Sequence, residues 1–350
     1  MSKRDVGAPE SSPMGPIGGG EGYADSIESG DFVVTGITDL RKALGSAQTE
    51  DVIFVPGDAE IDMTVCARAC REVIEIPGGV TLAGGRGIDG APGAMIYSDE
   101  FETQPLIRVV GDGARVTGLR IGGPDQKVRF EELIDALYHH PEMASDGKGY
   151  YSFPTSNGIE TECNGLTVDN CEIWGWGCAG VNLRQCAKTA HIHHNDIHHC
   201  QRAGLGYGIC FHGADGLVEF NRFDYTRHAI AGSGVPGTAY EARFNIHGPN
   251  STSHCFDMHG SEENSVLVEG RSIAGDWMKI HHNTFESDQS AVGIRALPGK
   301  FCEVHLNWFR GCRGEDAVKL YGEEAENDPT AFGINGNVIG PDQKPGGYPK

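Results

Sequence analysis

The chain has 350 residues, and its acidic side chains far outnumber the basic ones, with 49 Asp and Glu against 28 Lys and Arg. A formal charge of −21, with no basic tail or stripe to offset it, argues against a nucleic-acid-binding protein. The 51 glycines follow no Gly-X-Y period, which excludes collagen and favours a fold with a tight turn every few residues.

The N-terminal stretch, residues 1–30, is rich in Gly, Ser and Pro and is predicted to be a flexible tail. It lacks the apolar core of a signal peptide, and no run in the chain is long enough to span a membrane. The protein is therefore expected to be cytoplasmic, or secreted and already processed. Asp31–Thr35 is predicted as a short strand. Thr38 is then expected to N-cap a helix from Asp39 to about Ser46 that covers the open end of the fold.

Short runs rich in β-branched residues follow from Asp51 onward, separated by Gly, Pro and Asp. They are Val52–Val55, Val73–Ile76, Val80–Leu82, Ile107–Val110 and Val116–Ile121. The segments between them are too short to hold the crossover helices that join parallel strands in α/β proteins. This pattern predicts an all-β coil in which each turn of the chain places one strand on each side.

A short phrase recurs in the second half of the chain, in which an aliphatic residue precedes an Asn and an apolar residue follows it two places later. The asparagines are Asn170, Asn195, Asn221, Asn245, Asn283, Asn307 and Asn337. Neighbouring intervals are 195−170=25, 221−195=26, 245−221=24 and 307−283=24, and a fixed period in this range is typical of a solenoid. Asn tolerates the left-handed conformation of a sharp turn, and its amide can bond to the Asn of the next rung. We therefore predict a structural Asn ladder, of which the histidine-rich His191–His199 is one turn.

Two segments interrupt the repeat. Residues 122–156 include a predicted helix, Gln126–His140, and residues 247–279 lengthen one interval to 283−245=38. Insertions at fixed faces of a repeat fold commonly wall its binding cleft. A solenoid extends a single core, so one domain is predicted over residues 31–340, with a second flexible tail at 341–350.

By these features the chain resembles the pectin-lyase-like superfamily. The resemblance rests on Asp39–Leu44 followed by Asp51–Pro56, on Ile76–Gly87, on Val116–Arg120 and on the Asn-bearing rungs. It covers roughly residues 31–340 and implies an all-β, single-stranded right-handed parallel β-helix with an N-terminal capping helix and loop insertions. The superfamily includes lyases, hydrolases, epimerases and non-catalytic adhesins, so the fold leaves the activity open. The paired-Asp motifs of polygalacturonases and the calcium-binding Asp series of pectate lyases are not found in the sequence.

The strands that follow the Asn turns set a register for outward-facing side chains. Side chains alternate along a strand, so the residues one and three places after a core residue face solvent. With Val181, Ile209, Ile230, Phe256, Ile294 and Val318 as core residues, the outward pairs are Asn182 and Arg184, Cys210 and His212, Ala231 and Ser233, Asp257 and His259, Arg295 and Leu297, and Lys319 and Tyr321. Rungs stack about 4.8 Å apart, so these residues form one stripe, which we call the polar stripe. A single member is ordinary solvated surface, but the set favours a functional surface.

Asp257 and His259 anchor the polar stripe. They lie two residues apart on one strand and point the same way, which suits an acid/base pair. The phrase is similar to the Asp-Pro-His element of mannuronan C5-epimerases, with Met258 in place of Pro. His228 and His254 have the opposite parity and are expected in the core or in a turn. No cofactor is predicted, with a divalent metal bound by His254, Asp257 and His259 as the alternative.

The predicted function is a polysaccharide-active enzyme that works on a uronic-acid-containing glycan by elimination or C5 epimerisation. Both reactions begin when a base removes the C5 proton while cations hold the adjacent carboxylate. His259 or Tyr321 would act as base or acid, and Arg295, Lys319 and Arg184 would neutralise the carboxylate. The further candidates for binding substrate are His212, His228, His254, Tyr150 and Tyr151.

Two alternatives stay open at this point. One is a glycoside hydrolase that pairs Asp257 with Asp316 or Glu241. The other is a non-catalytic glycan-binding or structural β-helix. In each case the expected partner is a poly- or oligosaccharide, not a nucleic acid or a membrane, and the oligomeric state is not predicted.

Overall fold

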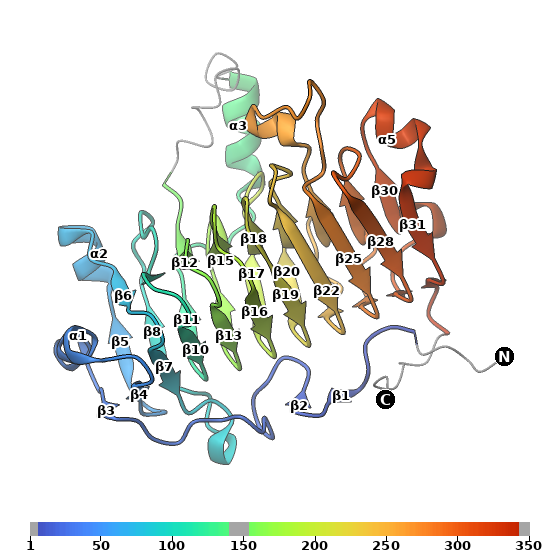
Figure 1. The fold of residues 1–350 in the computed structure, drawn as a ribbon. Helices are drawn as coiled ribbons and strands as arrows, with labels where there is room; N and C mark the ends of the chain where they lie inside the picture. Colours follow the sequence, from blue (N-terminus) through green and yellow to red (C-terminus); the bar gives the residue numbers. More distant parts are fainter. Residues whose placement is uncertain (1–5, 140–153, 343–350) are drawn as a thin grey trace.

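A computed structural model describes residues 6–139 and 154–342. The chain winds into a parallel β-helix whose three long sheets run the length of the molecule (Figure 1). Each rung passes through sheet 1, sheet 2 and sheet 3 in turn, and pairs in parallel with the rungs on either side. The predicted all-β solenoid is confirmed. Within the described ranges, no helix has both the length and the apolar character needed to cross a membrane.

The strands of each sheet follow one another at the spacing of one rung. Sheet 1 contains β3 (Phe32–Val33), β4 (Val52–Val55), β7 (Thr81–Gly84), β10 (Arg115–Thr117), β13 (Thr167–Asp169), β16 (Ala190–His193), β19 (Asp215–Glu219), β22 (Ala239–Arg243), β25 (Trp277–His281), β28 (Phe301–His305) and β31 (Phe332–Asn335). Sheet 2 contains β5 (Glu60–Asp62), β8 (Met95–Tyr97), β11 (Arg120–Gly122), β14 (Glu172–Trp174), β17 (Asp196–Cys200), β20 (Arg222–Thr226), β23 (Ile246–His247), β26 (Thr284–Phe285), β29 (Trp308–Phe309) and β32 (Val338–Ile339). Sheet 3 contains β6 (Ile74–Ile76), β9 (Ile107–Val109), β12 (Asn157–Thr161), β15 (Ala179–Leu183), β18 (Tyr207–Phe211), β21 (His228–Gly232), β24 (Phe256–Met258), β27 (Val292–Ile294) and β30 (Val318–Leu320).

Short helices lie at the ends of the solenoid and in its insertions. They are α1 (Ile37–Ser46), α2 (Thr64–Cys70), α3 (Phe130–His139), α5 (Glu323–Asn327) and the 3-10 turns η1 (Ile88–Gly90), η3 (Ser261–Asn264), η4 (Gly314–Asp316) and η5 (Pro329–Ala331). Helix α1 packs Leu40 and Ala43 onto the first rungs, as expected of a cap. Its N-cap is Gly36 without a side-chain bond, so Thr38 lies inside the helix and the predicted Thr cap is wrong.

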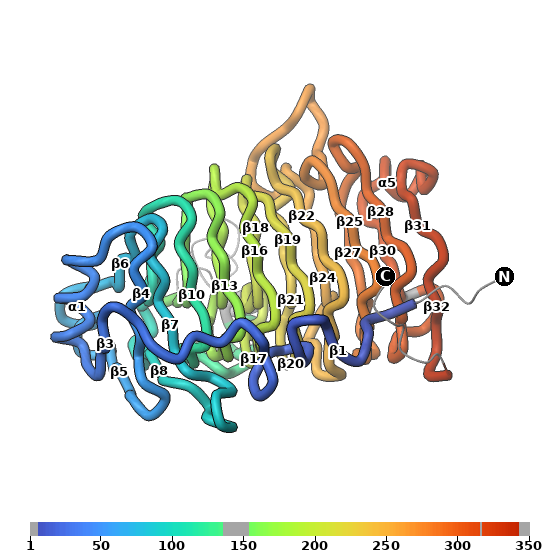
Figure 2. The backbone as a smooth tube through the Cα atoms, turned by 60° about the horizontal axis from the view of Figure 1, so that its bottom comes forward, coloured from blue at the N-terminus to red at the C-terminus, as the bar shows by residue number. Residues whose placement is uncertain are grey.

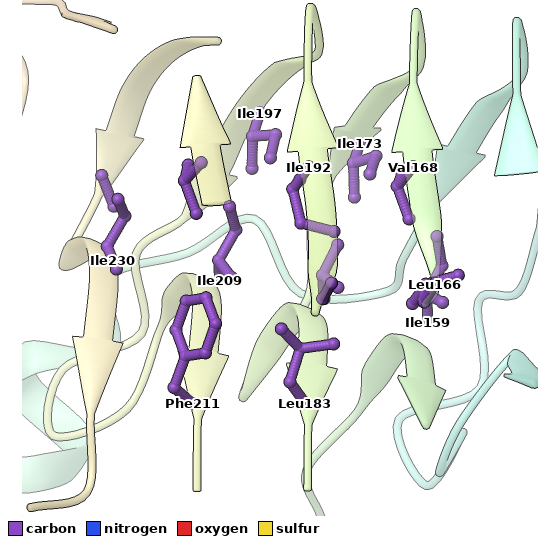
Figure 3. Packing of buried hydrophobic residues seen from close by; sticks show 14 of the residues in the cluster. Ile159, Leu166, Val168, Ile173, Leu183, Ile192, Ile197, Ile209, Phe211 and Ile230 are labelled. Carbon is purple, nitrogen blue, oxygen red and sulfur yellow. The ribbon is translucent and has the colours of Figure 1, made fainter. Parts of the chain in front are cut away.

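The core is one continuous stack of aliphatic and aromatic side chains inside the coil. Figure 3 shows Val168 and Ile192 from sheet 1, Ile173 and Ile197 from sheet 2, and Leu183 with other residues from sheet 3 converging on the axis. Each of these five side chains is fully buried. Equivalent apolar residues repeat in every rung, so burial holds the register of all three sheets at once.

The Asn ladder lies at the turn between sheets 1 and 2, but one member and its conformation differ from expectation. The left-handed residue in each rung is the one before the ladder Asn, for example His194 (φ 54°) before Asn195. In its rung, Asn170 is itself the left-handed residue (φ 53°), so Cys171 stands where the other rungs have the ladder Asn. The backbone N–H of Cys171 donates to Asn195 Oδ1. The ladder therefore runs from Asn195 to Asn337, with side-chain amides 2.9–3.1 Å from the next Oδ1.

Two other predicted segments, Val116–Ile121 and 247–279, differ in detail from the observed chain path. The run Val116–Ile121 forms two strands, β10 and β11, because Gly118 turns the chain with φ 66°. The predicted insertion 247–279 contains a regular strand, β24, so the extra residues lie before and after it. In Figure 1, the loop after β24 rises on the same edge as α3.

Residues 6–30, expected to be a loose tail, form a strap along the turn between sheets 1 and 2. Figure 2 shows it crossing the rungs from the C-terminal end of the helix towards the N-terminal end. Its backbone N–H groups donate to Leu306 and Phe220 carbonyls, and Tyr23 Oη donates to the buried Asp169 carboxylate at 2.9 Å. Ser12 Oγ lies 2.6 Å from His194 Nε2. The strap therefore covers the left-handed turns of the rungs it crosses.

Acid is expected to destabilise the protein through the buried His194 under this strap. Burial lowers the pKa of His194 to about 4, against an ordinary value near 6.5. Between these values the unfolded chain binds more protons, so the free energy of unfolding falls as the pH is lowered from about 6.5 to 4, by roughly 3 kcal/mol. His194→Asn keeps a residue that tolerates the left-handed backbone and should make the melting temperature fall less steeply with pH over this window. Burial also lowers the pKa of His193 and His247 to about 4, so part of the slope should remain. Equal slopes for both proteins would contradict the assignment.

Candidate functional site

The polar stripe predicted from the strand register lies on the outer face of sheet 3. The core residues Gly232, Met258, Ile294 and Leu320 are paired in register from rung to rung. The residues that follow them, Ser233, His259, Arg295 and Tyr321, are therefore aligned, and Leu183 and Phe211 extend the row to Arg184 and His212. Arg295 aligns with His259 and Tyr321, and Gly293 aligns with Asp257. The sequence analysis had aligned Arg295 with Asp257 and Lys319. In the structure Gly293 holds that position, so the predicted register of this strand was wrong by two residues.

Asp257 on β24 is the centre of the site. Its side chain is completely buried, yet it points outward from the core. Arg295 donates to it through Nη2 (2.8 Å) and Nε (3.2 Å). His254 Nδ1 lies 3.1 Å from Oδ1, and His259 Nε2 lies 2.8 Å from Oδ2. Arg295 and the Nδ1–H of His254 donate to the carboxylate, which makes this a stable position for an anion.

His254 connects Asp257 to Tyr321. Its Nδ1 faces the carboxylate, and its Nε2 lies 2.7 Å from the Tyr321 hydroxyl. A carboxylate only accepts hydrogen bonds, so Nδ1 carries the proton and Nε2 accepts from the phenol. The three groups form a chain from a buried anion to a partly exposed hydroxyl. Such a chain can take a proton from the phenol and stabilise the imidazolium that results.

The loop after β24 contributes Glu263, which the sequence analysis missed. Its carboxylate lies 3.2 Å from Arg295 Nη1 and 3.5 Å from His259 Nδ1. Arg295 is thus held by two carboxylates, those of Asp257 and Glu263. The signal was present in the sequence as the acidic pair Glu262–Glu263, which follows the Asp-Met-His phrase after two intervening residues, but the path of the loop back over the strand was not.

Burial and charge set the protonation of the groups in this cluster. Burial alone would raise the pKa of Asp257, but the surrounding imidazoles outweigh it and hold this pKa well below its ordinary value. Burial lowers the pKa of the fully enclosed His228 well below 6.5. Burial lowers the pKa of Arg295 too, but the charges of Asp257 and Glu263 leave it raised. The resting site therefore holds an ionised Asp257, a charged Arg295 and a neutral His228.

His228 lies at the start of β21, in a stack of rings beneath the site. Its ring is parallel to Tyr207 on one side (5.8 Å between centroids) and to His254 on the other (5.7 Å). Its Nε2 lies 3.5 Å from Asp257 Oδ2. His228, Asp257 and His259 form a group whose ligand atoms all lie within 4.8 Å of one another, as a metal ion would require. His254, expected in that group, has its Nε2 directed at Tyr321.

The remaining predicted residues lie farther along sheet 3 or outside the described residues. Lys319 on β30 aligns with Gly293 and Asp257, two rungs from the latter. Arg184 and His212 follow β15 and β18, and Arg184 pairs with Glu160 at 3.6 Å. Tyr150 and Tyr151 lie outside the described residues.

Two hollows flank the cluster along the polar stripe. One, of about 340 Å³, lies beside Arg295 and is walled by Leu267, Arg271, Leu297 and Glu323. The other, of about 410 Å³, is lined by Arg184, Arg108, Glu160, Glu162 and Cys163. A larger hollow of about 530 Å³ near Arg71 and Gln104 lies at the N-terminal end, away from the charged cluster. The stripe thus offers an elongated surface with Asp257 between two recesses.

Comparison with known proteins identifies similar folds and no sequence family. No family model matches the chain, and no curated protein matches it by sequence. An alginate lyase from Paenibacillus sp. str. FPU-7 superposes with a TM-score of 0.61 and 15% identity, covering 91% of this chain and 96% of that one. At this identity the likeness shows a shared parallel β-helix fold.

Two looser similarities are to the A-module of the mannuronan C-5 epimerase AlgE6 from Azotobacter vinelandii and to the catalytic unit of a GH87 alpha-1,3-glucanase from Streptomyces thermodiastaticus strain HF3-3. The epimerase module has a TM-score of 0.40 and 12% identity, covering 87% of this chain and 95% of that one. The glucanase has a TM-score of 0.44 and 12% identity, covering 95% and 73%.

Proposed function

We propose that this chain is a polysaccharide-active enzyme that removes the C5 proton of a uronic-acid residue, leading to elimination or C5 epimerisation. The observation that carries the proposal is the chain of contacts from Asp257 through His254 to the Tyr321 hydroxyl. It supplies a base on the outer face of sheet 3, where a long polymer could lie across several rungs.

In the proposed reaction, Tyr321 gives its phenolic proton to His254 Nε2 and the phenolate takes the C5 proton of the sugar. Asp257 holds the Nδ1–H tautomer of His254 and stabilises the imidazolium that forms, as the Asp of a catalytic triad does. In elimination, the C4–O bond breaks as the Tyr321 hydroxyl passes the proton taken from C5 to the leaving 4-oxygen, and His254 returns its proton to the phenolate. In epimerisation, water protonates the opposite face of C5 and the resulting hydroxide takes the extra proton of His254 through Tyr321.

The developing charge on the substrate carboxylate has to be stabilised by positive groups. Arg295 and Lys319 are the nearest cationic side chains on the polar stripe, and His259 borders the same space. Arg184 and His212 lie two to three rungs away, where they would contact neighbouring sugars of the polymer. The net charge of −21 opposes a polyanion at long range, but this local group acts within a Debye length.

The glycoside hydrolase alternative has less support. It needs two carboxyl groups on either side of one glycosidic bond. Glu241 lies on β22 in sheet 1, whereas Asp257 lies on β24 in sheet 3, so these two do not face one site. The side chain of Asp316 lies outside the described residues.

The function is tested on a panel of uronide polymers, assayed for the ultraviolet absorbance of unsaturated products, for new reducing ends and for C5 deuterium exchange. Tyr321→Phe removes only the hydroxyl and should lower kcat by about 100-fold or more, because general acid–base groups contribute about this much. Tyr225→Phe is the matched control, since Tyr225 lies exposed on sheet 2 and stacks on His199. Wild-type protein inactive on every polymer by all three assays would sink the proposal in favour of a binding or structural role.

A further inference from the structure

Two buried imidazole nitrogens point at one oxygen of Asp257 without completing a hydrogen bond to it. His228 Nε2 lies 3.5 Å and His259 Nε2 lies 2.8 Å from Oδ2. Both nitrogens are shielded from solvent and lack a hydrogen-bond partner among the described residues. Polar atoms so deeply buried nearly always have partners, so the two unsatisfied nitrogens call for an explanation.

The tautomer of His228 is fixed by its other nitrogen. Nδ1 lies 2.6 Å from the backbone carbonyl oxygen of His254. A carbonyl can only accept, so Nδ1 carries the hydrogen and Nε2 of the neutral ring carries a lone pair. That lone pair faces the Asp257 carboxylate, which is also an acceptor. Two acceptors in this position in a dry environment require a positive charge between them.

His259 has the same arrangement with a different outer partner. Its Nδ1 lies 3.5 Å from the Glu263 carboxylate and its Nε2 lies 2.8 Å from that of Asp257, so either nitrogen can hold the ring hydrogen. With an ion on Nε2, the hydrogen lies on Nδ1 and faces Glu263. Metal-binding histidines typically direct their second nitrogen to a carboxylate or a backbone carbonyl, which orients the ring and fixes its tautomer. His228 and His259 each show one of these two forms. Arg295 and His254 bond to Asp257 in turn and would orient the third ligand.

We propose that His228 Nε2, His259 Nε2 and Asp257 Oδ2 bind a divalent transition-metal ion, with zinc as the ion that suits them best. Two imidazoles and one carboxylate are the three-ligand set of open zinc sites, which keep a further position for water or substrate. Calcium and magnesium prefer oxygen ligands alone and fit this set less well. The sequence had named His254 as the second imidazole. In the structure, His228 takes that place.

The ion would supply a positive charge that Arg295 cannot fully provide, because Arg295 already pairs with Asp257 and Glu263. Its role, which rests on the proposed function, is to hold the substrate carboxylate next to the proton that Tyr321 removes. Metal binding itself follows from the ligand geometry and stands without that function.

The test uses the full chain stripped with chelator and titrated with zinc in a calorimeter, and with cobalt followed by its visible absorption. One ion per chain is expected, with cobalt absorption typical of a mixed nitrogen and oxygen site. His228→Gln and His259→Gln should each weaken zinc binding by at least tenfold. His281→Gln is the control, since His281 lies on sheet 1 against His305 and should leave the affinity unchanged. Circular dichroism checks that each variant is folded.

A second measurement avoids variants altogether. Nitrogen-15 shifts of the metal-free wild type should show His228 as the neutral Nδ1–H tautomer, with Nε2 shifting when zinc is added. An imidazolium at neutral pH, no zinc binding, or binding unaffected by both His→Gln variants would overturn the metal site. Zinc binding in a protein inactive on all uronides would leave the site standing and refute the proposed reaction. Activity in chelator-stripped protein without bound metal would leave the reaction standing and refute the ion's role in it.

Discussion

Replacing Asp257 by Asn should cause the largest loss of activity of any single substitution in this chain. The amide can no longer stabilise an imidazolium at His254, and it removes the anion that Arg295 and His259 face. Loss of the corresponding Asp in a catalytic triad costs about 10⁴-fold in kcat, so a fall of at least about 10³-fold is expected here. Removing one partner of a buried charge pair also costs roughly 3 kcal/mol of stability. Initial rates and urea denaturation measure the two effects separately.

Asp276→Asn provides the matched control for this substitution. Asp276 pairs with the exposed Lys300 at 3.0 Å, and ion pairs of this kind contribute about 1 kcal/mol or less. Its Oδ1 also accepts from the Gly237 backbone N–H at 2.9 Å, which the amide oxygen of an Asn can still do. It should retain wild-type activity and nearly wild-type stability. If Asp257→Asn kept more than a tenth of the wild-type rate, Asp257 would not be part of the proton-transfer chain.

The outer face of the site could be predicted because strand alternation is a local property. Once Phe256 is placed in the core, Asp257 must point outward, and the register pairs confirm it. It was harder to predict which outward residues lie beside each other on neighbouring rungs. Ile294 and Val292 have the same parity, so either could align with Phe256. We predicted Ile294 as the partner of Phe256, but in the structure Phe256 pairs with Val292.

The ring stack beneath the site depends on the turn between sheets 2 and 3, which alternation does not describe. His228 and His254 are separated by 254−228=26 residues, the same interval as Ile230 and Phe256, 256−230=26. This equality indicates that the two histidines occupy equivalent positions on neighbouring rungs. It does not show that their rings turn outward at the strand start, which follows from the packing of Tyr207 and the chain path before β24.

The N-terminal strap shows how composition alone misleads. Its glycines suggested flexibility, yet several lie where a side chain would collide with the solenoid. A Cβ at Gly19 would come within 2.3 Å of the His194 carbonyl oxygen, and one at Gly7 within 2.9 Å of Trp308. Both glycines have positive φ and allow the strap to approach the rungs closely. Glycine permits either disorder or tight contact, and only the surface it meets decides between them.

The largest loss of stability outside the site is expected from Asn245→Ala in the middle of the Asn ladder. Asn245 Oδ1 accepts from the backbone and side chain of Asn221, and its Nδ2 donates to the Val218 carbonyl and to Asn283 Oδ1. All of these groups are buried, so the alanine leaves a backbone N–H and a carbonyl without partners. Each unsatisfied group costs about 1–3 kcal/mol, which gives a total of roughly 3–5 kcal/mol in urea denaturation.

Because each rung contacts only its neighbours, the damage should also be local. Hydrogen exchange is expected to lose protection first in the strands on either side of Asn245, β19, β22 and β25, while rungs near β7 and β10 keep theirs. Asn335→Ala is the matched control, since Asn335 lies exposed on the last strand of sheet 1 and its side-chain amide is 3.4 Å from the Gly333 carbonyl oxygen. It should change stability by about 0.5 kcal/mol or less. Equal destabilisation by the two variants would mean that stacked strands and the apolar core hold the rungs together, and that the amide ladder adds little to them.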